Sequence, residues 1–222
     1  SRAFEDMLQT ARCGFDYIFL DAPAGVDAGF RLAAKFADRF LVVTGAGPAA
    51  VRDAARVGDI LELMGKKIDV GIGNFGGIRI DMPQGDIILD DMLSMFPFKN
   101  QLVYVEHTGK QIRTILEQMA ERRFQVLGGV RVEAENGKLL SVEIAGEPLD
   151  DEKVYGLATI SFLLEGGDGL ALAQNALSVT VYEDVPIIDA ILEHIAAETA
   201  AGRPIEYKTD GRVKVKDDRR RR

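Results

Sequence analysis

Three short segments carry residue types that could bind a flat, polar ligand. They are residues 74–79 (Asn-Phe-Gly-Gly-Ile-Arg), 96–100 (Phe-Pro-Phe-Lys-Asn) and 162–169 (Phe-Leu-Leu-Glu-Gly-Gly-Asp-Gly). Adjacent glycines let the backbone approach a ligand because no Cβ intervenes. A guanidinium and an amide can fix polar groups, and two separated phenylalanines beside turns can hold a flat ring between them. We therefore predict that the three segments converge on one small-molecule site with the shape of a nucleoside.

Apolar runs next to these segments predict the elements that position them. Residues 130–134 and 139–145 flank Asn136-Gly137, a dipeptide that favours a tight β-hairpin. Pro186 suits the first turn of a helix over residues 187–200. Further strands are predicted over 68–72, 101–106, 154–160 and 179–182, and an amphipathic helix over 110–123. From residue 68 onward the chain therefore has an α+β pattern with a mixed sheet.

The first 67 residues show a different pattern, of the α/β type. Residues 16–21 and 39–44 are apolar at consecutive positions, as buried parallel strands are. Residues 29–36 and 49–64 are helix-like, which gives a short parallel βαβα fragment whose sheet helices must cover. The sequence thus predicts two domains, residues 1–67 and 68–222, with the first packed on or beside the second.

Composition and charge exclude several classes of function. The apolar fraction is 47% and the charged fraction is 28%, as in soluble globular proteins. The net charge of −8 argues against broad binding to nucleic acid or anionic membranes. No run approaches the roughly 18 apolar residues of a membrane span, and residues 1–10 do not resemble a signal peptide. We expect a soluble chain, although the absence of an initial Met is compatible with a missing upstream piece.

No catalytic or metal-ligating constellation is recognisable. The two histidines, His107 and His194, have no ligand-like spacing, and no Ser/His/Asp set is visible. The single Cys13 excludes an internal disulfide. We therefore predict no catalytic residue, no metal site and no cofactor in this chain.

Part of the first domain resembles the MinD/ParA-type P-loop ATPases, which act in partition. The resemblance is carried by residues 15–25 (Phe-Asp-Tyr-Ile-Phe-Leu-Asp-Ala-Pro-Ala-Gly), 40–44 and 50–54. It implies that Asp21 orients magnesium or its water and that the turn at residues 23–25 senses a γ-phosphate. A P-loop requires a glycine-rich turn with Lys and Ser/Thr, and none is present. ATPase activity is therefore the weaker interpretation.

The second domain resembles the C-terminal domain of the 5'-nucleotidase/UDP-sugar hydrolase family along nearly all of residues 68–222. The three segments described first carry this resemblance, together with residues 128–131 (Gly-Gly-Val-Arg) and 211–213 (Gly-Arg-Val). In that family this domain binds the nucleoside, and a separate metallophosphatase domain holds two divalent metals and hydrolyses the phosphoester. The resemblance therefore implies a nucleoside or nucleotide ligand, with any metal in a domain outside this chain.

Individual roles follow from the same resemblance. Phe98 and Phe162 would sandwich the base, and Asp168 would accept hydrogen bonds from the ribose hydroxyls. Asn74 would read the base edge, and Arg79 would meet ribose or phosphate oxygens. The backbone would approach the ligand at the glycines of the same motifs, Gly76, Gly77 and Gly167.

Each of these residues also has a simpler interpretation. Phenylalanines beside turns are commonly core residues, and we assign Phe75 and Phe96 to the core. Asp168 could satisfy turn amides, and Arg79 could belong to a surface ion pair. We further predict that the charged tail, residues 214–222, is disordered.

The leading prediction is therefore a composite chain. It would join a partition-ATPase-like fragment to the substrate-binding domain of a 5'-nucleotidase-type hydrolase that lacks its metallophosphatase domain. The alternative is a non-catalytic scaffold or interaction protein, or a remnant of a MinD-like cell-division or partition ATPase. The nucleotidase resemblance implies a periplasmic or extracellular compartment, and the ATPase resemblance implies a cytoplasmic one.

Overall fold

A computed structural model describes residues 2–22, 25–26, 28–206 and 209–216. The chain divides into two compact units, residues 1–65 and 66–222. The family-like motifs at residues 74–79, 96–100 and 162–169 all lie in the second unit.

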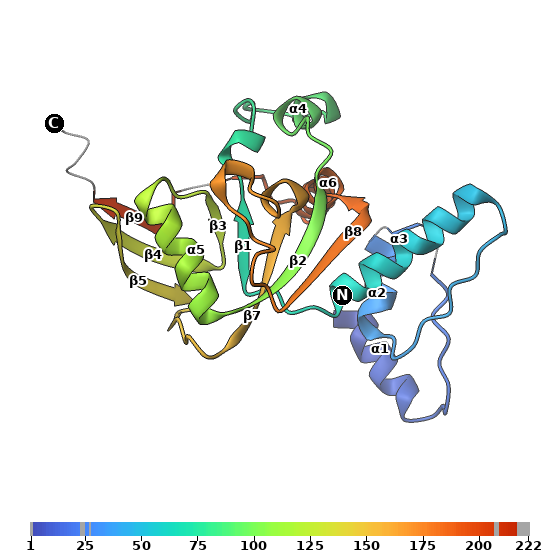
Figure 1. Cartoon of the computed structure of the whole chain (residues 1–222). Helices are drawn as coiled ribbons and strands as arrows, with labels where there is room; N and C mark the ends of the chain where they lie inside the picture. Colours follow the sequence, from blue (N-terminus) through green and yellow to red (C-terminus); the bar gives the residue numbers. More distant parts are fainter. Residues whose placement is uncertain (1, 23–24, 27, 207–208, 217–222) are drawn as a thin grey trace. The chain divides into compact units, whose positions relative to one another are not determined.

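The first unit is helical where it is regular. It contains α1 (Arg2–Arg12), α2 (Ala28–Phe36) and α3 (Pro48–Met64) (Figure 1). Pro48 occupies the first turn of α3, where its missing N–H needs no partner. The Gly65 N–H caps the other end by donating to the Leu61 and Glu62 carbonyls. Both helices predicted for this region, at 29–36 and 49–64, are confirmed.

The two strands predicted in the first unit are absent. Residues 16–21 and 39–44 form no strand, and several of their apolar side chains lie in solvent, with Phe19 91% and Leu41 87% exposed. The βαβα prediction is therefore wrong in its β part. A strand needs neighbours for its backbone hydrogen bonds, and two short parallel strands cannot form a stable sheet alone. Among the described residues of this unit no further strand supplies those bonds.

The second unit contains a mixed sheet of five strands in the order β3-β1-β7-β2-β8 (Figure 1). β1 runs parallel to β7, and the other pairs are antiparallel. The strands are β1 (Val70–Gly73), β2 (Gln101–Thr108), β3 (Val126–Gly128), β7 (Val154–Ile160) and β8 (Ser178–Pro186). The mixed sheet predicted for this region is confirmed.

A second sheet has the order β6-β5-β4-β9. Asn136 and Gly137 adopt positive φ angles of 51° and 84° between β4 and β5, which is the geometry that favours this dipeptide in hairpins. The strands are β4 (Val130–Glu135), β5 (Lys138–Ile144), β6 (Glu147–Pro148) and β9 (Val213–Lys216). β9 corrects the disorder predicted for residues 214–222, because residues 214–216 of that tail pair in parallel with β4. Residues 217–222 of that tail lie outside the described residues.

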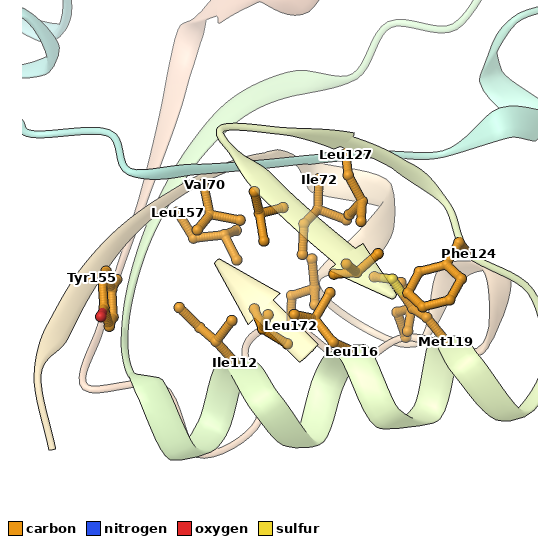
Figure 2. Packing of buried hydrophobic residues seen from close by; sticks show 14 of the residues in the cluster. Val70, Ile72, Ile112, Leu116, Met119, Phe124, Leu127, Tyr155, Leu157 and Leu172 are labelled. Atoms are coloured by element: carbon orange, nitrogen blue, oxygen red, sulfur yellow. The ribbon is translucent and has the colours of Figure 1, made fainter. Parts of the chain in front are cut away.

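Helix α5 (Gly109–Glu121) packs against the core that joins the two sheets. Thr108 and Gln111 form a capping box at its start, which satisfies two backbone amides that would otherwise lack partners. Ile112, Leu116 and Met119 recur at helical spacing and are fully or almost fully buried (Figure 2). They belong to one continuous apolar cluster that includes strand residues of both sheets. The remaining helical elements are α4 (Leu89–Met95), α6 (Ile187–Ala200) and the 3-10 turns η1 (Phe75–Gly77), η2 (Ser161–Leu163) and η3 (Gly167–Gly169).

Candidate functional site

Three adjacent strands bring the predicted segments to one edge of the five-stranded sheet. β1 ends at Gly73 and the parallel β7 ends at Ile160, so residues 74–79 and 161–169 both leave the sheet at that edge. β2 is antiparallel to β7 and pairs Leu102 with Ile160, so residues 96–100 enter at the same edge. The topology thus places all three segments together, as predicted.

Gly76 lies between the two polar side chains predicted to bind a nucleoside. A Cβ on Gly76 would be 3.5 Å from the Asn74 Nδ2 atom and 4.0 Å from the Asp168 Oδ2 atom. A Cβ on Gly77 would approach the Asn74 Oδ1 atom to within 2.5 Å, which is closer than real side chains come. Gly76 therefore leaves the space between the amide and the carboxylate free of a side chain, and Gly77 leaves room for the Asn74 amide.

The side-chain amide of Asn74 and the carboxylate of Asp168 have no hydrogen-bonding partner among the described residues. Asn74 precedes one 3-10 turn and Asp168 lies within another, yet neither turn has a side-chain cap. Neither side chain forms a hydrogen bond or an ion pair with any described residue. Asp168 has φ 51° and ψ 23°, a left-handed conformation between Gly166 and Gly169, which also have positive φ. The simpler interpretation, in which Asp168 satisfies turn amides, is therefore not what the structure shows.

Arg79 connects the first segment to the second. Its Nη1 donates a hydrogen bond to the Gly76 carbonyl at 3.2 Å. Its guanidinium carbon lies 5.9 Å from the centroid of the Phe98 ring, within the range of a cation–π contact. Its backbone N–H donates to the Met95 carbonyl at the end of α4. Arg79 therefore holds Phe98 beside the glycine turn.

The two phenylalanines predicted to hold the base are both accessible. Phe98 is 48% exposed and Phe162 is 46% exposed. Within the described residues their rings make no direct contact with each other. A Cβ on Gly167 would lie 2.7 Å from the Cδ1 and Cε1 atoms of Phe162, so a glycine is required where η3 passes this ring. Both rings are available to a ligand, and neither belongs to the core.

Phe75 differs from its predicted place in the core. The residue is 44% exposed, and the guanidinium of Arg123 covers one face of its ring at 4.8 Å from the centroid. Phe96 is half-buried. Phe75 begins η1 two residues after the end of β1, outside the sheet, and its side chain lies at the surface.

Three residues after α5 contact the site and were missed by the sequence analysis. The Arg122 Nη1 donates to the Gly169 carbonyl at 3.3 Å, and the Gln125 Oε1 accepts from the Phe75 N–H at 2.9 Å. Arg123 covers Phe75 as described. These contacts join positions far apart in the sequence, and the only signal was a pair of arginines at the end of a predicted helix.

A pocket of about 340 Å³ lies between α5 and residues 169–175. Arg122 and Gly169 line it, but none of the eight predicted site residues does. The candidate site is therefore distinct from this pocket, which adjoins the Asp168 turn at Gly169.

Comparison with known proteins identifies the family. A sequence model described as the 5'-nucleotidase C-terminal domain matches residues 33–175, which is more than half of the 222 residues. The chain therefore belongs to the family of 5'-nucleotidase C-terminal domains.

Curated relatives agree with this assignment. Protein UshA of Escherichia coli (strain K12) is 32% identical over 153 residues, which cover 65% of this chain and 27% of that protein. Protein UshA of Salmonella pullorum is 37% identical over 112 residues, which cover 48% of this chain and 20% of that protein. The chain thus spans about a fifth to a quarter of the length of these two relatives.

Solved structures share the fold. A 5'-nucleotidase precursor from Thermus thermophilus aligns with a TM-score of 0.62 at 23% identity, covering 74% of this chain and 34% of that one. The NAD nucleotidase of Haemophilus influenzae aligns with a TM-score of 0.57 at 26% identity, covering 68% of this chain and 30% of that one. The mixed fold of the second unit is therefore that of the 5'-nucleotidase structures.

The family match begins at residue 33, inside the segment that resembles partition ATPases. That second resemblance stays a prediction, and residues 23 and 24 of its γ-phosphate turn lie outside the described residues. Among the helices that the structure describes, none is both long and apolar enough to cross a membrane.

Proposed function

We propose that this chain is the nucleoside- or nucleotide-binding part of a 5'-nucleotidase-type hydrolase. The observation that carries the proposal is the pair formed by Asn74 and Asp168. An amide and a carboxylate, both without partners among the described residues, lie near one glycine turn, and two accessible phenylalanines follow or precede strands at the same edge of the sheet. A nucleoside presents complementary groups: a flat base with polar edges and a ribose with vicinal hydroxyls.

Each side chain then has one task. Phe98 and Phe162 stack on the base, and Asn74 reads its edge. An ionised Asp168 accepts hydrogen bonds from two ribose hydroxyls, since a carboxylate is acceptor-only with two oxygens. Arg79 meets ribose or phosphate oxygens, for which a planar guanidinium is suited. Stacking supplies affinity with little base preference.

Phosphoester hydrolysis is assigned to residues outside this chain. The described residues offer no group of three His, Cys, Asp or Glu side chains close enough to hold a metal ion. The family resemblance implies that the two divalent metals lie in a separate domain. The matched relatives are several times longer than this chain, which leaves room for a separate metallophosphatase domain as its partner.

Calorimetry with adenosine, AMP and UDP-glucose tests the proposal. We expect binding to the wild-type chain and a loss of about tenfold or more in affinity for Phe162→Ala, because stacking contributes roughly 1–3 kcal/mol per base. Asp168→Asn keeps the shape of the side chain but adds donors, and it should weaken adenosine binding more than 2'-deoxyadenosine binding.

Phe15→Ala is the matched control, since Phe15 is a solvent-exposed phenylalanine outside the three segments. Its affinity should equal that of the wild type. Equal affinity of the Phe162→Ala and Phe15→Ala variants would reject a stacking role for Phe162. No binding of any of the three ligands to the wild type would reject the function.

We further propose that residues 15–25 and 40–44 are a fragment of the partition-ATPase type, as their sequence suggests. Their exposed apolar side chains, Tyr17 and Phe19 among them, are what strands without sheet neighbours would show. Because no P-loop is present in the sequence, we expect no ATP turnover by this chain with magnesium. Measurable turnover abolished by Asp21→Ala would instead favour a true ATPase. The compartment that accords with the nucleotidase family is periplasmic or extracellular, and cell fractionation would test it.

A further inference from the structure

We propose that residues 122–125, the segment directly after α5, position the two polar groups of the candidate site relative to each other. We call Arg122, Arg123, Phe124 and Gln125 the positioning segment. It contacts the Asn74 loop with one part and the Asp168 loop with another. The inference rests on the proposed function, because it concerns the same nucleoside site.

Gln125 and Arg123 fix the Asn74 loop. Gln125 is 9% exposed, and its Oε1 accepts a 2.9 Å hydrogen bond from the N–H of Phe75, the residue next to Asn74. The Arg123 guanidinium lies over the Phe75 ring at 4.8 Å. Phe75 is therefore held both through its backbone N–H, which donates to Gln125, and through its ring, which contacts Arg123. The direction of the Asn74 amide depends on how Phe75 is held.

Arg122 fixes the Asp168 loop from the other side. Its Nη1 donates to the Gly169 carbonyl at 3.3 Å. Gly169 has φ +75°, and a Cβ there would overlap Nη1 of Arg122. The guanidinium thus packs closely on the backbone of the residue that follows Asp168.

The positioning segment is itself anchored on both sides. Phe124 is 8% exposed and belongs to the continuous core, where Figure 2 shows it with the α5 side chains. Strand β3 follows at once and pairs Val126 with Gly73 in antiparallel register. Continuing that register places Gln125 opposite Asn74. Because both ends are fixed, the segment sets the spacing between the base-reading amide and the ribose-binding carboxylate.

Double-mutant cycles distinguish positioning from a general structural role. Gln125→Leu removes the acceptor, and we expect about fivefold weaker adenosine binding, since one hydrogen bond makes a small net contribution. In an Asn74→Ala background the same change should have no further effect, whereas in an Asp168→Ala background it should keep its full effect. Gln125→Glu retains an acceptor oxygen and should restore wild-type affinity.

Arg122→Met provides the reciprocal cycle. We expect Arg122→Met to weaken adenosine binding about as much as Gln125→Leu does. This loss should disappear in the Asp168→Ala background and persist in the Asn74→Ala background. Thermal unfolding of each variant identifies any that do not fold. If Gln125→Leu does not fold, the affinity of Gln125→Glu tests the inference at position 125. Equal effects in both backgrounds, or no effect in the wild-type background, would overturn the inference while leaving the proposed function intact. A wild-type chain that binds none of adenosine, AMP and UDP-glucose would overturn both.

Discussion

The guanidinium carbon of Arg79 lies 5.9 Å from the centroid of the Phe98 ring. The same guanidinium donates to the Gly76 carbonyl, so one side chain links the glycine turn to an aromatic face of the site. A cation over one face of a ring leaves its other face for a base. Arg79 is thus expected both to orient Phe98 and to meet the ligand.

Replacing Arg79 should weaken ligand binding through both contacts. We expect Arg79→Ala to reduce adenosine affinity about fivefold to tenfold, given roughly 0.5–1 kcal/mol for an exposed cation–π contact plus a hydrogen bond. If Arg79 contacts phosphate, the loss will be larger for AMP than for adenosine in calorimetry. Arg79→Lys keeps the charge but not the planar fork, and it should recover only part of the affinity. Unchanged affinity for both ligands would remove Arg79 from the site.

Gly167→Ala should both weaken ligand binding and lower the stability of the fold. An added Cβ would overlap the Phe162 backbone carbonyl oxygen and meet the Phe162 ring at 2.7 Å, so the η3 turn itself must move. We expect at least about tenfold weaker adenosine binding and about 1–3 kcal/mol lower stability, as is typical of overpacking. Gly58→Ala is the matched control, because nothing lies within 4 Å of a Cβ there and the residue is inside α3. It should leave binding unchanged, and weakened binding in this control would point to a non-local effect.

The buried face of α5 should dominate the stability of the second unit. Leu116 is 0% exposed, and Leu116→Ala is expected to cost about 2–5 kcal/mol in the free energy of unfolding. Leu140 is 62% exposed, and Leu140→Ala should change the free energy by no more than about 0.5 kcal/mol. Urea denaturation monitored by circular dichroism measures both. Similar losses for the two variants would contradict the packing in Figure 2.

Asp210 should make stability depend on pH only in strong acid. Hydrogen bonds from the Arg212 side chain and backbone lower the pKa of Asp210 from 3.8 to about 2. Because the folded pKa lies below the unfolded value, this stabilisation is present above about pH 4 and is lost as the pH falls through about 2. Asp210→Asn should therefore lower the melting temperature at about pH 5 and lose this effect once the pH is below about 2. A difference that persists in strong acid would contradict the Asp210–Arg212 pairing.

The structural features that could be predicted are mainly those formed by residues close together in the sequence. The hairpin at Asn136-Gly137 was predictable because that dipeptide itself favours the required positive φ angles. Helices 49–64 and 110–123 follow from helical spacing of apolar residues and from local stop signals. The convergence of residues 74–79, 96–100 and 162–169 was predicted from the residue types at the ends of apolar runs, and the family resemblance supplied the role of each residue.

Features set by distant partners were missed. Residues 16–21 have the composition of a buried strand, but composition does not supply the neighbouring strand that would pair with them. The charged residues of β9 form a strand because β4 offers an open edge far away in the sequence. Gln125 gave no local signal and Arg122 only that of an arginine at the end of a predicted helix, since their partners are 50 and 47 positions away.

The position of β7 between β1 and β2 has a consequence for hydrogen exchange. Each of these three strands is joined to one loop of the site. A ligand that contacts all three loops would hold the ends of the three strands together. Opening β1 away from β7 would then require the ligand to leave. Amide protons at the ends of β1 and β7 should accordingly exchange with deuterium more slowly as ligand saturates the protein, whereas those of the hairpin between β4 and β5 should exchange at an unchanged rate.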